Sequence, residues 1–318
     1  MLKPTHFTNR IIWILLAWFA LYELLDEIFI IGFYSFLKHF FWRVSNAMMF
    51  VFEYYTPLIA SVAFFVVFCL LSKKNRFLLD VIKPTREGRS MKMLGFGILL
   101  GFLTNFFCIL CAMLHGDVKF YYDFSASQIP VMVFAFICVF FQSTSEELWC
   151  RCYLYERINV HYPLWLAILI NGTLFGLMHI FNDGITVLAM ADLIFCGIFY
   201  SLARWYSGSI WISFGMHTMW NFTQQFIFGL PNSGLVSEAS IFHLDALNAT
   251  SNLIYDYTFG VEGALPAVLM EILPIVVILL LAKRDGRLGE LRESRESRGE
   301  MPVLPPKTPE PPVVEIPQ

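Results

Sequence analysis

The chain has 318 residues, of which 57% are hydrophobic and only 15% are charged. A soluble globular domain has about 25% charged residues, so this composition excludes an ordinary soluble protein. The net formal charge is only −3, and the basic residues fall in short clusters rather than on one long face, which argues against a nucleic-acid partner. Apolar runs of about 20 residues, the length that crosses the hydrocarbon core of a bilayer, recur along the chain. The sequence therefore predicts a multi-pass integral membrane protein in the lipid bilayer.

The apolar runs predict an all-α, polytopic membrane helical bundle, because backbone exposed to lipid must satisfy its own hydrogen bonds. About eight transmembrane helices are expected, at residues 11–36, 47–71, 92–114, 128–149, 163–181, 185–203, 209–229 and 264–282. Seven cysteines lie in or at the ends of these runs, and an odd number inside the membrane region does not indicate a disulfide framework.

The distribution of basic residues predicts the orientation of the bundle. An even number of spans puts both termini on the same side of the membrane. With both termini inside, 19 of the 22 Lys and Arg residues lie on the inner side, and only Lys38, Arg43 and Lys119 lie outside. Because short cytoplasmic segments are enriched in Lys and Arg, the N- and C-termini are predicted to be cytoplasmic.

Two segments between and after the predicted spans differ from the rest in composition. Residues 231–263 contain no Lys or Arg but have four acidic residues, Glu238, Asp245, Asp256 and Glu262. We expect a solvated external loop there, with contact to a substrate as the alternative. Residues 283–318 become charged and then Pro-rich, which predicts a disordered cytoplasmic tail whose partner the sequence does not indicate.

Ionisable side chains inside membrane spans are costly unless they are paired or hydrated, so they are the first candidates for function. Glu147 and Arg151 are four residues apart with the acid first, which favours a helical ion pair. Such a pair leaves Glu146, about 100° further round the helix, available as a general base. The alternative is that both glutamates flank the helix in the headgroup region. The lone acids Asp192 and Glu271 are interpreted as packing or cavity residues.

Two further motifs place polar residues on single helix faces. His217 and Asn221 are four residues apart, and both side chains can donate hydrogen bonds to the oxyanion of a tetrahedral intermediate. The alternative is a polar stripe that joins neighbouring helices. Phe175 and His179 have the same spacing in the preceding predicted span, so three motifs of this kind lie on three helices.

This ordered set of motifs resembles the CPBP family of intramembrane proteases, also called Abi or type II CAAX prenyl endopeptidase-like. The motifs are Glu146-Glu147-x3-Arg151, Phe175-x3-His179 and His217-x3-Asn221. The family-like catalytic core would cover residues 127–230, after three N-terminal helices in residues 1–126. The external loop (231–263), the last helix (264–282) and the tail (283–318) would follow it.

The resemblance implies hydrolysis of a peptide bond in a membrane-associated peptide or protein. The first candidate substrate is a peptide with a prenylated CAAX-type end. Glu146 and His179 would activate a water molecule, and His217 and Asn221 would stabilise the oxyanion. Glu147, Arg151 and Phe175 would support them. This scheme needs no cofactor and is favoured. It also needs the helix of Glu146 to continue to about Arg157, because His179 lies about 24 Å along its own helix.

Other activities remain as alternatives. A zinc-dependent version of the same protease would use Glu146, His179 and His217 as ligands, since two histidines and a glutamate match a catalytic zinc set. A catalytically silent membrane scaffold, or a bacteriocin-immunity or other partner-binding protein, would retain the fold without the chemistry. A transporter would use the intramembrane acids and histidines as proton relays, but no inverted repeat supports that class. The HExxH and GxSxG motifs of other hydrolases are absent.

Overall fold

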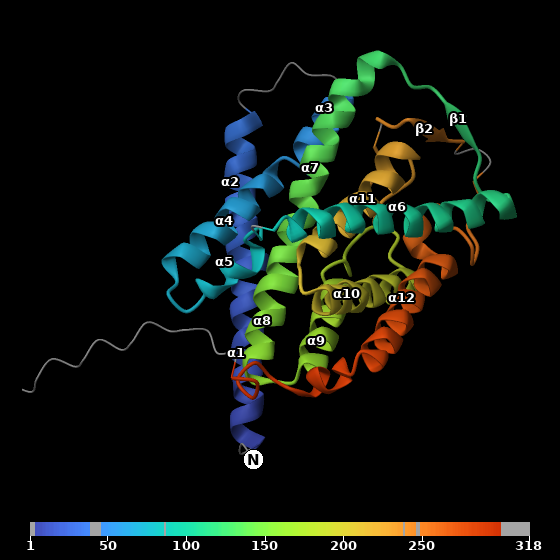
Figure 1. Ribbon diagram of the computed structural model, residues 1–318. Coiled ribbons are helices and arrows are strands. Elements are labelled where there is room, and N and C mark those ends of the chain that lie inside the picture. The colour runs from blue at the N-terminus through green and yellow to red at the C-terminus, as the bar shows by residue number, and fades with distance from the viewer. Residues whose placement is uncertain (1–3, 39–45, 86, 238, 246–248, 300–318) are drawn as a thin grey trace, which may run out of the picture.

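The computed structural model describes residues 4–38, 46–85, 87–237, 239–245 and 249–299 (Figure 1). The α-helices are α1 (Pro4–Phe19), α2 (Glu27–Lys38), α3 (Asn46–Tyr54), α4 (Pro57–Leu71), α5 (Phe77–Ile82), α6 (Arg89–His115), α7 (Ile129–Glu147), α8 (Tyr155–His161), α9 (Leu164–Leu177), α10 (Val187–Ser207), α11 (Trp211–Phe222) and α12 (Leu265–Arg284). The π-helical segments are η1 (Ala20–Asp26), η3 (Leu148–Leu154) and η4 (Thr223–Ile227). The 3-10 segments are η2 (Ala126–Gln128), η5 (Val261–Gly263) and η6 (Arg287–Arg292). The strands β1 (Phe120–Tyr122) and β2 (Phe242–Leu244) form one short antiparallel pair, and the predicted all-α class is confirmed.

Five helical segments in the described part of the chain are long and apolar enough to cross a membrane. They are Met48–Leu71, Arg89–His115, Ala126–His161, Val187–Ser207 and Leu265–Arg284. The chain is therefore an integral membrane protein, as predicted, whereas the number of eight spans stays a prediction. The expected span at 163–181 becomes α9, which is apolar but only 14 residues long. The one at 209–229 becomes α11 and η4, and buried Gln224 and Gln225 make η4 polar.

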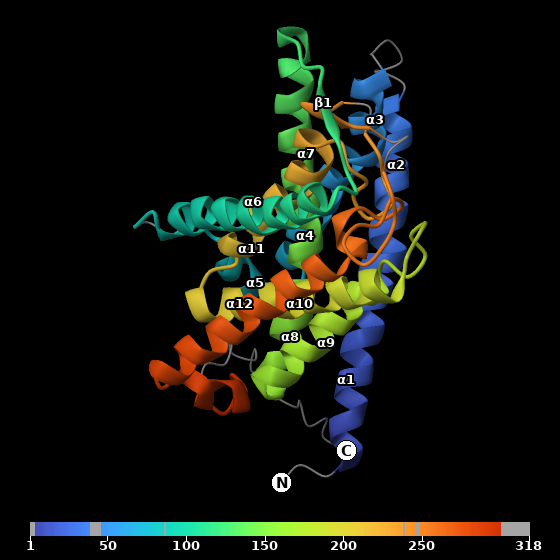
Figure 2. The same ribbon diagram turned by 90° about the vertical axis from the view of Figure 1, so that its right-hand side faces the viewer.

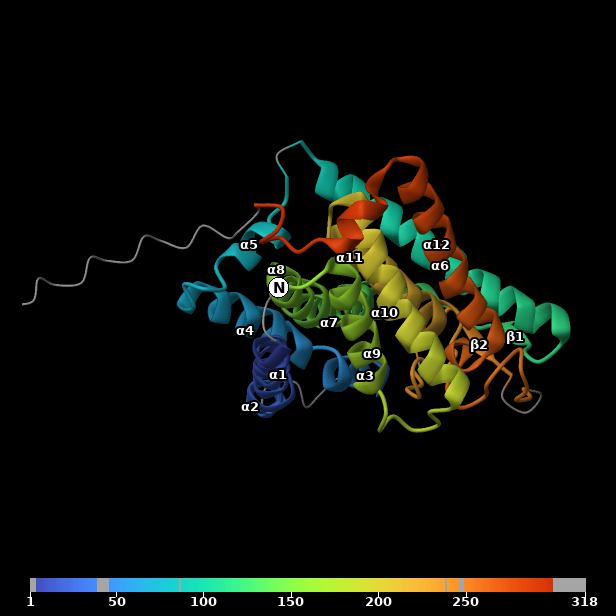
Figure 3. The same cartoon turned by 90° about the horizontal axis from the view of Figure 1, so that it is seen from below.

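The helices run in two main directions. In Figure 1, α1 and α2 form one long rod and α7 and α8 form another, and α4 packs between α2 and α7. Figures 1 and 2 both show α6 lying across α7, while it packs along α11. Seen from below in Figure 3, α6, α10 and α12 run in similar directions, and α12 contacts both of the other two. The three sequence motifs, on or next to α7, α9 and α11, thus meet where the two directions cross.

The contact between α6 and α11 depends on glycines that let the two backbones touch. A Cβ atom on Gly97 would lie 2.2 Å from the carbonyl oxygen of Ile212, and one on Gly101 would lie 2.3 Å from that of Met216. Gly215 faces α6 from α11 in the same way. Small residues four apart are a common device for close helix packing in membranes. The close packing fixes the position of α11, and with it the positions of His217 and Asn221, which α11 carries.

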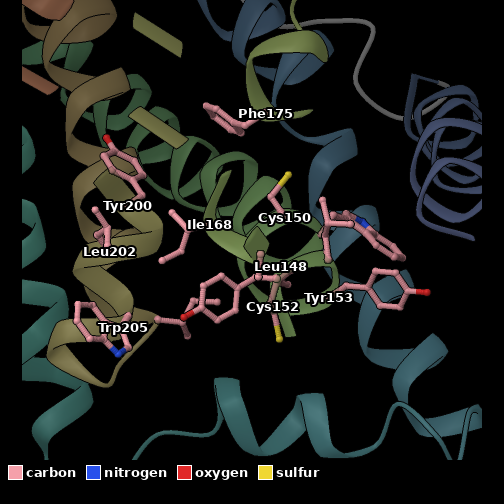
Figure 4. Packing of buried hydrophobic residues seen from close by; sticks show 14 of the residues in the cluster. Leu148, Cys150, Cys152, Tyr153, Ile168, Phe175, Tyr200, Leu202 and Trp205 are labelled. Carbon is pink, nitrogen blue, oxygen red and sulfur yellow. The ribbon is translucent and has the colours of Figure 1, made fainter. Parts of the chain in front are cut away.

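The main core surrounds η3, all seven residues of which are buried. Figure 4 shows Cys150 and Cys152 of η3 in the same buried cluster as Ile168 of α9 and Leu202 of α10. Cys150 and Cys152 are free thiols, as are the other five cysteines, so the prediction that they form no disulfide framework is confirmed.

The C-terminal segment stays on the bundle for longer than the sequence suggested. The predicted disordered tail begins at Lys283, but α12 continues to Arg284 and η6 follows it. Arg295 then forms an ion pair with Glu156 at 2.5 Å, and the Glu293 carbonyl accepts a hydrogen bond from the backbone of α9. The physical reason is the carboxylate of Glu156, which is buried and attracts cationic partners. Residues 300–318 of the predicted tail lie outside the described residues.

Candidate active site

A continuous helical rod carries the first motif. The helix was predicted to continue to about Arg157, and it does so, because α7, η3 and α8 follow one another without a break as far as His161. Its middle, η3, begins directly after Glu146 and Glu147 and has the wider π-helical turn. Such segments are rare and occur frequently at functional sites.

Glu147 and Arg151 form the predicted ion pair, with 2.9 Å between Oε1 and Nη1. Both side chains are fully buried. The guanidinium of Arg151 lies 4.0 Å from the ring centre of Phe175 on α9 and 5.5 Å from that of Tyr200 on α10. A buried charge is tolerated when it is paired, and aromatic faces attract cations, so these contacts make the pair tenable. Phe175 therefore ties α9 to the ion pair.

His217 of α11 lies between the two glutamates. Its Nδ1 is 3.0 Å from Oε1 of Glu147, and its Nε2 is 3.8 Å from Oε2 of Glu146. A carboxylate paired with an arginine accepts hydrogen bonds and donates none, so Nδ1 of His217 carries the proton in this contact. The ring is thereby oriented with Nε2 toward Glu146. The motif spacing related His217 only to Asn221, so its contacts with the two glutamates were not predicted from the sequence.

Glu146 has one satisfied and one unsatisfied carboxylate oxygen. Gln142, one turn earlier, donates from Nε2 to Oε1 of Glu146 at 2.5 Å. Gln142 also accepts a hydrogen bond from Nδ2 of Asn221 at 3.0 Å, so Asn221 is connected to Glu146 through Gln142. Oε2 of Glu146 is buried and has no hydrogen-bond partner among the described residues. It is the oxygen that is nearest to His217.

His179 follows the end of α9, which stops at Leu177. Its Nδ1 is 2.9 Å from the carbonyl oxygen of Phe175. Because a carbonyl oxygen only accepts, Nδ1 carries the proton, and Nε2 of the neutral ring is left as an acceptor. Across the described residues, no hydrogen bond joins His179 directly to Glu146. The two side chains meet only through the cavity that both of them line.

A cavity of about 260 Å³ brings the three motifs together. Five of the predicted site residues line it: Glu146, Phe175, His179, His217 and Asn221. Asp192 of α10 and Glu271 of α12 also line it and are 2% and 1% exposed, so the interpretation of these lone acids as cavity residues is confirmed. Among the described residues that form the wall, none is Lys or Arg. The cavity is therefore rich in carboxyl groups and imidazoles.

The expected solvated loop instead closes one wall of this cavity. Glu262 is only 4% exposed and lines the cavity together with Asn232 and Ser233. It accepts hydrogen bonds from Nε1 of Trp220 at 2.9 Å and from the backbone and hydroxyl of Ser233 at 2.8 Å. Burial raises the pKa of Glu262, although these hydrogen bonds act in the opposite direction. The expectation of a solvated residue is wrong for Glu262, because the chain folds back over α11; Glu238 lies outside the described residues.

Some residues of the site were not found from the sequence. Gln142 precedes Glu146 by four residues, and this spacing would have indicated their hydrogen bond. Tyr200 and Glu262 reach the site only through tertiary contacts. No local spacing relates them to the three motifs.

The proposed zinc ligands do not form a metal site in this arrangement. In the described part of the chain, no group of three or more His, Cys, Asp or Glu side chains has a geometry that could hold a metal ion. The contacts of Nδ1 of His217 with Glu147 and of Nδ1 of His179 with a carbonyl oxygen leave Nε2 of each ring, so the spacing of the whole group, and not these contacts, is what fails to form a metal site. We therefore derive no step of the reaction through a metal.

Comparison with known proteins identifies one family. Residues 128–223 match the family model described as type II CAAX prenyl endopeptidase Rce1-like. No curated protein and no solved structure matches the chain. The matched segment runs from the residue before α7 to the first residue of η4, so it contains all three motifs.

Proposed function

We propose that this chain, whose residues 128–223 form a type II CAAX prenyl endopeptidase Rce1-like domain, is an intramembrane endopeptidase that uses a water activated by Glu146. One observation carries the proposal. Oε2 of Glu146 is buried in the cavity without a hydrogen-bond partner among the described residues, 3.8 Å from Nε2 of His217. A buried carboxylate oxygen is costly to leave unsatisfied, so this oxygen suits a bound water. A scaffold would have no need of this glutamate in one cavity with two histidines.

In the proposed reaction, Glu146 takes a proton from this water as the water oxygen attacks the carbonyl carbon of the scissile peptide bond. Negative charge develops on the carbonyl oxygen, and a hydrogen bond from Asn221 stabilises it. His217 adds a second hydrogen bond from Nε2 when this nitrogen carries a proton in addition to the one on Nδ1. Asn221 has a second amide proton available, because only one is used by Gln142. As the C–N bond breaks, the proton held by Glu146 passes to the leaving amine.

His179 has a separate role in this scheme. Its Nδ1–H is fixed by the carbonyl of Phe175, so its Nε2 can accept a hydrogen bond from the attacking water. This assignment keeps the predicted partnership of Glu146 and His179, now acting through a shared water rather than through direct contact. Glu147 and Arg151 hold His217 in orientation and do not touch the substrate.

The proposed substrate is a membrane-associated peptide, with a prenylated CAAX-type peptide as the first candidate. Aromatic and apolar side chains of the N-terminal helices line the same cavity, namely Tyr22, Tyr54 and Leu58. They supply an apolar surface beside the carboxyl groups, which suits a substrate carrying a lipid group. Both termini are proposed to be cytoplasmic, a topology supported by the bias of Lys and Arg toward the inner segments.

The test is cleavage of a panel of prenylated and unprenylated peptides by purified protein in detergent. Wild type, Glu146→Gln and the control Glu87→Gln are compared, since Glu87 is exposed in the loop before α6 and lies outside the cavity. We expect Glu146→Gln to lose at least about 1,000-fold in kcat/KM, because the general base and the water ligand are lost together. Glu87→Gln should match wild type. Equal cleavage by wild type and Glu146→Gln would contradict the assignment.

The same assay separates the zinc-dependent alternative. We expect a strong chelator to leave the activity unchanged. Activity that is lost in chelator and restored by one equivalent of zinc would replace the glutamate-activated water with a metal-bound one.

A further inference from the structure

A second cavity, of about 390 Å³, lies at the ends of three helical segments that are long enough to cross a membrane. Arg89 and Ser90 at the start of α6 line it, as do residues near the end of α8 and of α10. Figure 3 shows α5, α8, the start of α6 and the C-terminal segment near one another in the view from below. Because membrane-crossing helices end close to the bilayer surface, this cavity belongs to the membrane–water interface.

The cavity has an excess of positive charge. Five basic side chains line it: Lys83, Arg89, Arg204, Arg295 and Arg298. Only two acidic side chains do so, Asp80 and Glu156. The buried carboxylate of Glu156 pairs with both Arg204 and Arg295, so one negative charge there is shared between two positive ones.

Two of the basic side chains are available to a ligand. The side chain of Lys83 is exposed and has neither a hydrogen-bond nor an ion-pair partner in the described part of the chain. Arg89 is also exposed and forms no salt bridge there. Its Nη2 donates to the carbonyl oxygen of Ser207 at 2.5 Å, and this neutral acceptor directs the guanidinium without cancelling its charge. Both cations therefore face the cavity without a counter-ion.

The surroundings of these cations fit an anionic headgroup. The N-terminus of α6, a helix of 27 residues, is at the cavity, and the partial positive charge of a helix N-terminus favours an anion. Thr85 and Ser209 line the same cavity, and the Thr85 hydroxyl accepts a hydrogen bond from the backbone N–H of Ser90. Trp205 and Trp211 also line it, and tryptophan is enriched at the level of lipid headgroups.

We propose that this cavity binds the phosphate group of an anionic phospholipid. Basic pockets between membrane helices are suited to such headgroups. A phosphate group could also come from a soluble anion, but the cavity lies at helix ends and is flanked by tryptophans, which favours the lipid. The proposal is independent of the proposed peptidase activity, because no residue of the catalytic cavity takes part in it.

The test uses purified full-length protein in nanodiscs of phosphatidylcholine alone or with about one anionic phosphatidylglycerol in five lipids. Retention of phosphatidylglycerol by the protein, measured by native mass spectrometry, and the gain in Tm on adding this lipid are the two readouts. A basic residue near the surface contributes about a 5-fold gain in affinity for anionic lipid. Lys83→Gln with Arg89→Gln should therefore bind phosphatidylglycerol about 30-fold more weakly.

Two further variants serve as a charge-matched control and as a test of Lys83 alone. Lys73→Gln with Lys74→Gln removes the same charge from exposed residues just after α4 that do not line the cavity, and it should bind phosphatidylglycerol like wild type. Lys83→Gln alone breaks no contact in the described structure, so it should fold normally and bind about 5-fold more weakly. Unchanged binding by both Lys83 variants would overturn the proposal. Displacement of the lipid by millimolar inorganic phosphate would reassign the cavity to a soluble anion.

Discussion

Replacing Arg151 with methionine should be among the most damaging single substitutions in this protein. Methionine fills part of the volume but leaves the carboxylate of Glu147 fully buried without its cationic partner at 2.9 Å. Removing one partner of a buried ion pair costs about 3–5 kcal/mol. Loss of the guanidinium from the face of the Phe175 ring, 4.0 Å away, adds about 1 kcal/mol. We expect the free energy of unfolding to fall by about 4–6 kcal/mol.

The reasoning can be tested by removing the orphaned charge as well. In the double variant Glu147→Gln with Arg151→Met, no buried charge lacks a partner, and the amide oxygen at position 147 can still accept the proton on Nδ1 of His217. The double variant should therefore recover about half of the lost free energy of unfolding. The measurement is reversible unfolding in mixed micelles by titration with sodium dodecyl sulfate, followed by tryptophan fluorescence.

The control is Arg292→Met, which changes the same side chain at an exposed position of η6. It should change the free energy of unfolding by less than about 0.5 kcal/mol. A double variant as unstable as Arg151→Met alone would refute the reasoning. The loss would then come from packing around η3 and not from an orphaned carboxylate.

Three further predictions concern other parts of the structure. Gly101→Leu should lower the free energy of unfolding by about 3 kcal/mol, because even its Cβ would lie 2.3 Å from the carbonyl oxygen of Met216. The measurement is the same titration. Gly95→Leu is the control and should be tolerated, because a Cβ atom at that position would have nothing within 4 Å. Gln142→Ala should lower kcat by about 10- to 100-fold and leave the Tm nearly unchanged, because it removes the hydrogen bonds that Gln142 makes with Glu146 and Asn221. A parallel loss of Tm would indicate a structural role for Gln142 instead. Burial opposes ionisation of Asp117, but hydrogen bonds from Asn252, Thr250 and His115 outweigh it and lower the pKa of Asp117 below the ordinary value of 3.8. The stabilisation by ionised Asp117 is thus complete above pH 3.8 and is lost as the pH falls below that value through the lowered pKa. Amide exchange at residues 249–253 should therefore accelerate only at acidic pH in wild type, and at every pH in Asp117→Asn. Identical exchange in both proteins would contradict this prediction.

The parts of the site that local spacing determines were predictable. Glu147 and Arg151 lie on one helix four residues apart, so their ion pair follows from helix geometry alone. The continuation of that helix past Arg157 followed from the need to bring Glu146 to the depth of His179. The division of labour between Glu146 and His179 stays a prediction, since only function can test it.

The parts that depend on distant chain segments were not predictable. His217 meets Glu147 across 70 positions of sequence, and Glu262 enters the cavity only because the loop folds back over α11. Composition also misplaced the start of the tail, because a charged, Gly-containing segment has no apolar stripe to indicate packing. The segment is held by Arg295, which pairs with the buried carboxylate of Glu156, and by backbone hydrogen bonds such as the one from Leu164 to the Glu293 carbonyl oxygen.

The π-helical segment η3 has a consequence for how the two cavities are related. The same rod lines one cavity with Glu146, before η3, and the other with Glu156, after it. A wide turn between them sets the rotational phase of α8 relative to α7. Deleting one residue within 148–154 would rotate everything after it by about 100°, turning Glu156 away from Arg204 while leaving Glu146 in place. The seven residues of η3 therefore fix the angle between the end of this helix that carries Glu146 and the end that lines the basic cavity with Glu156.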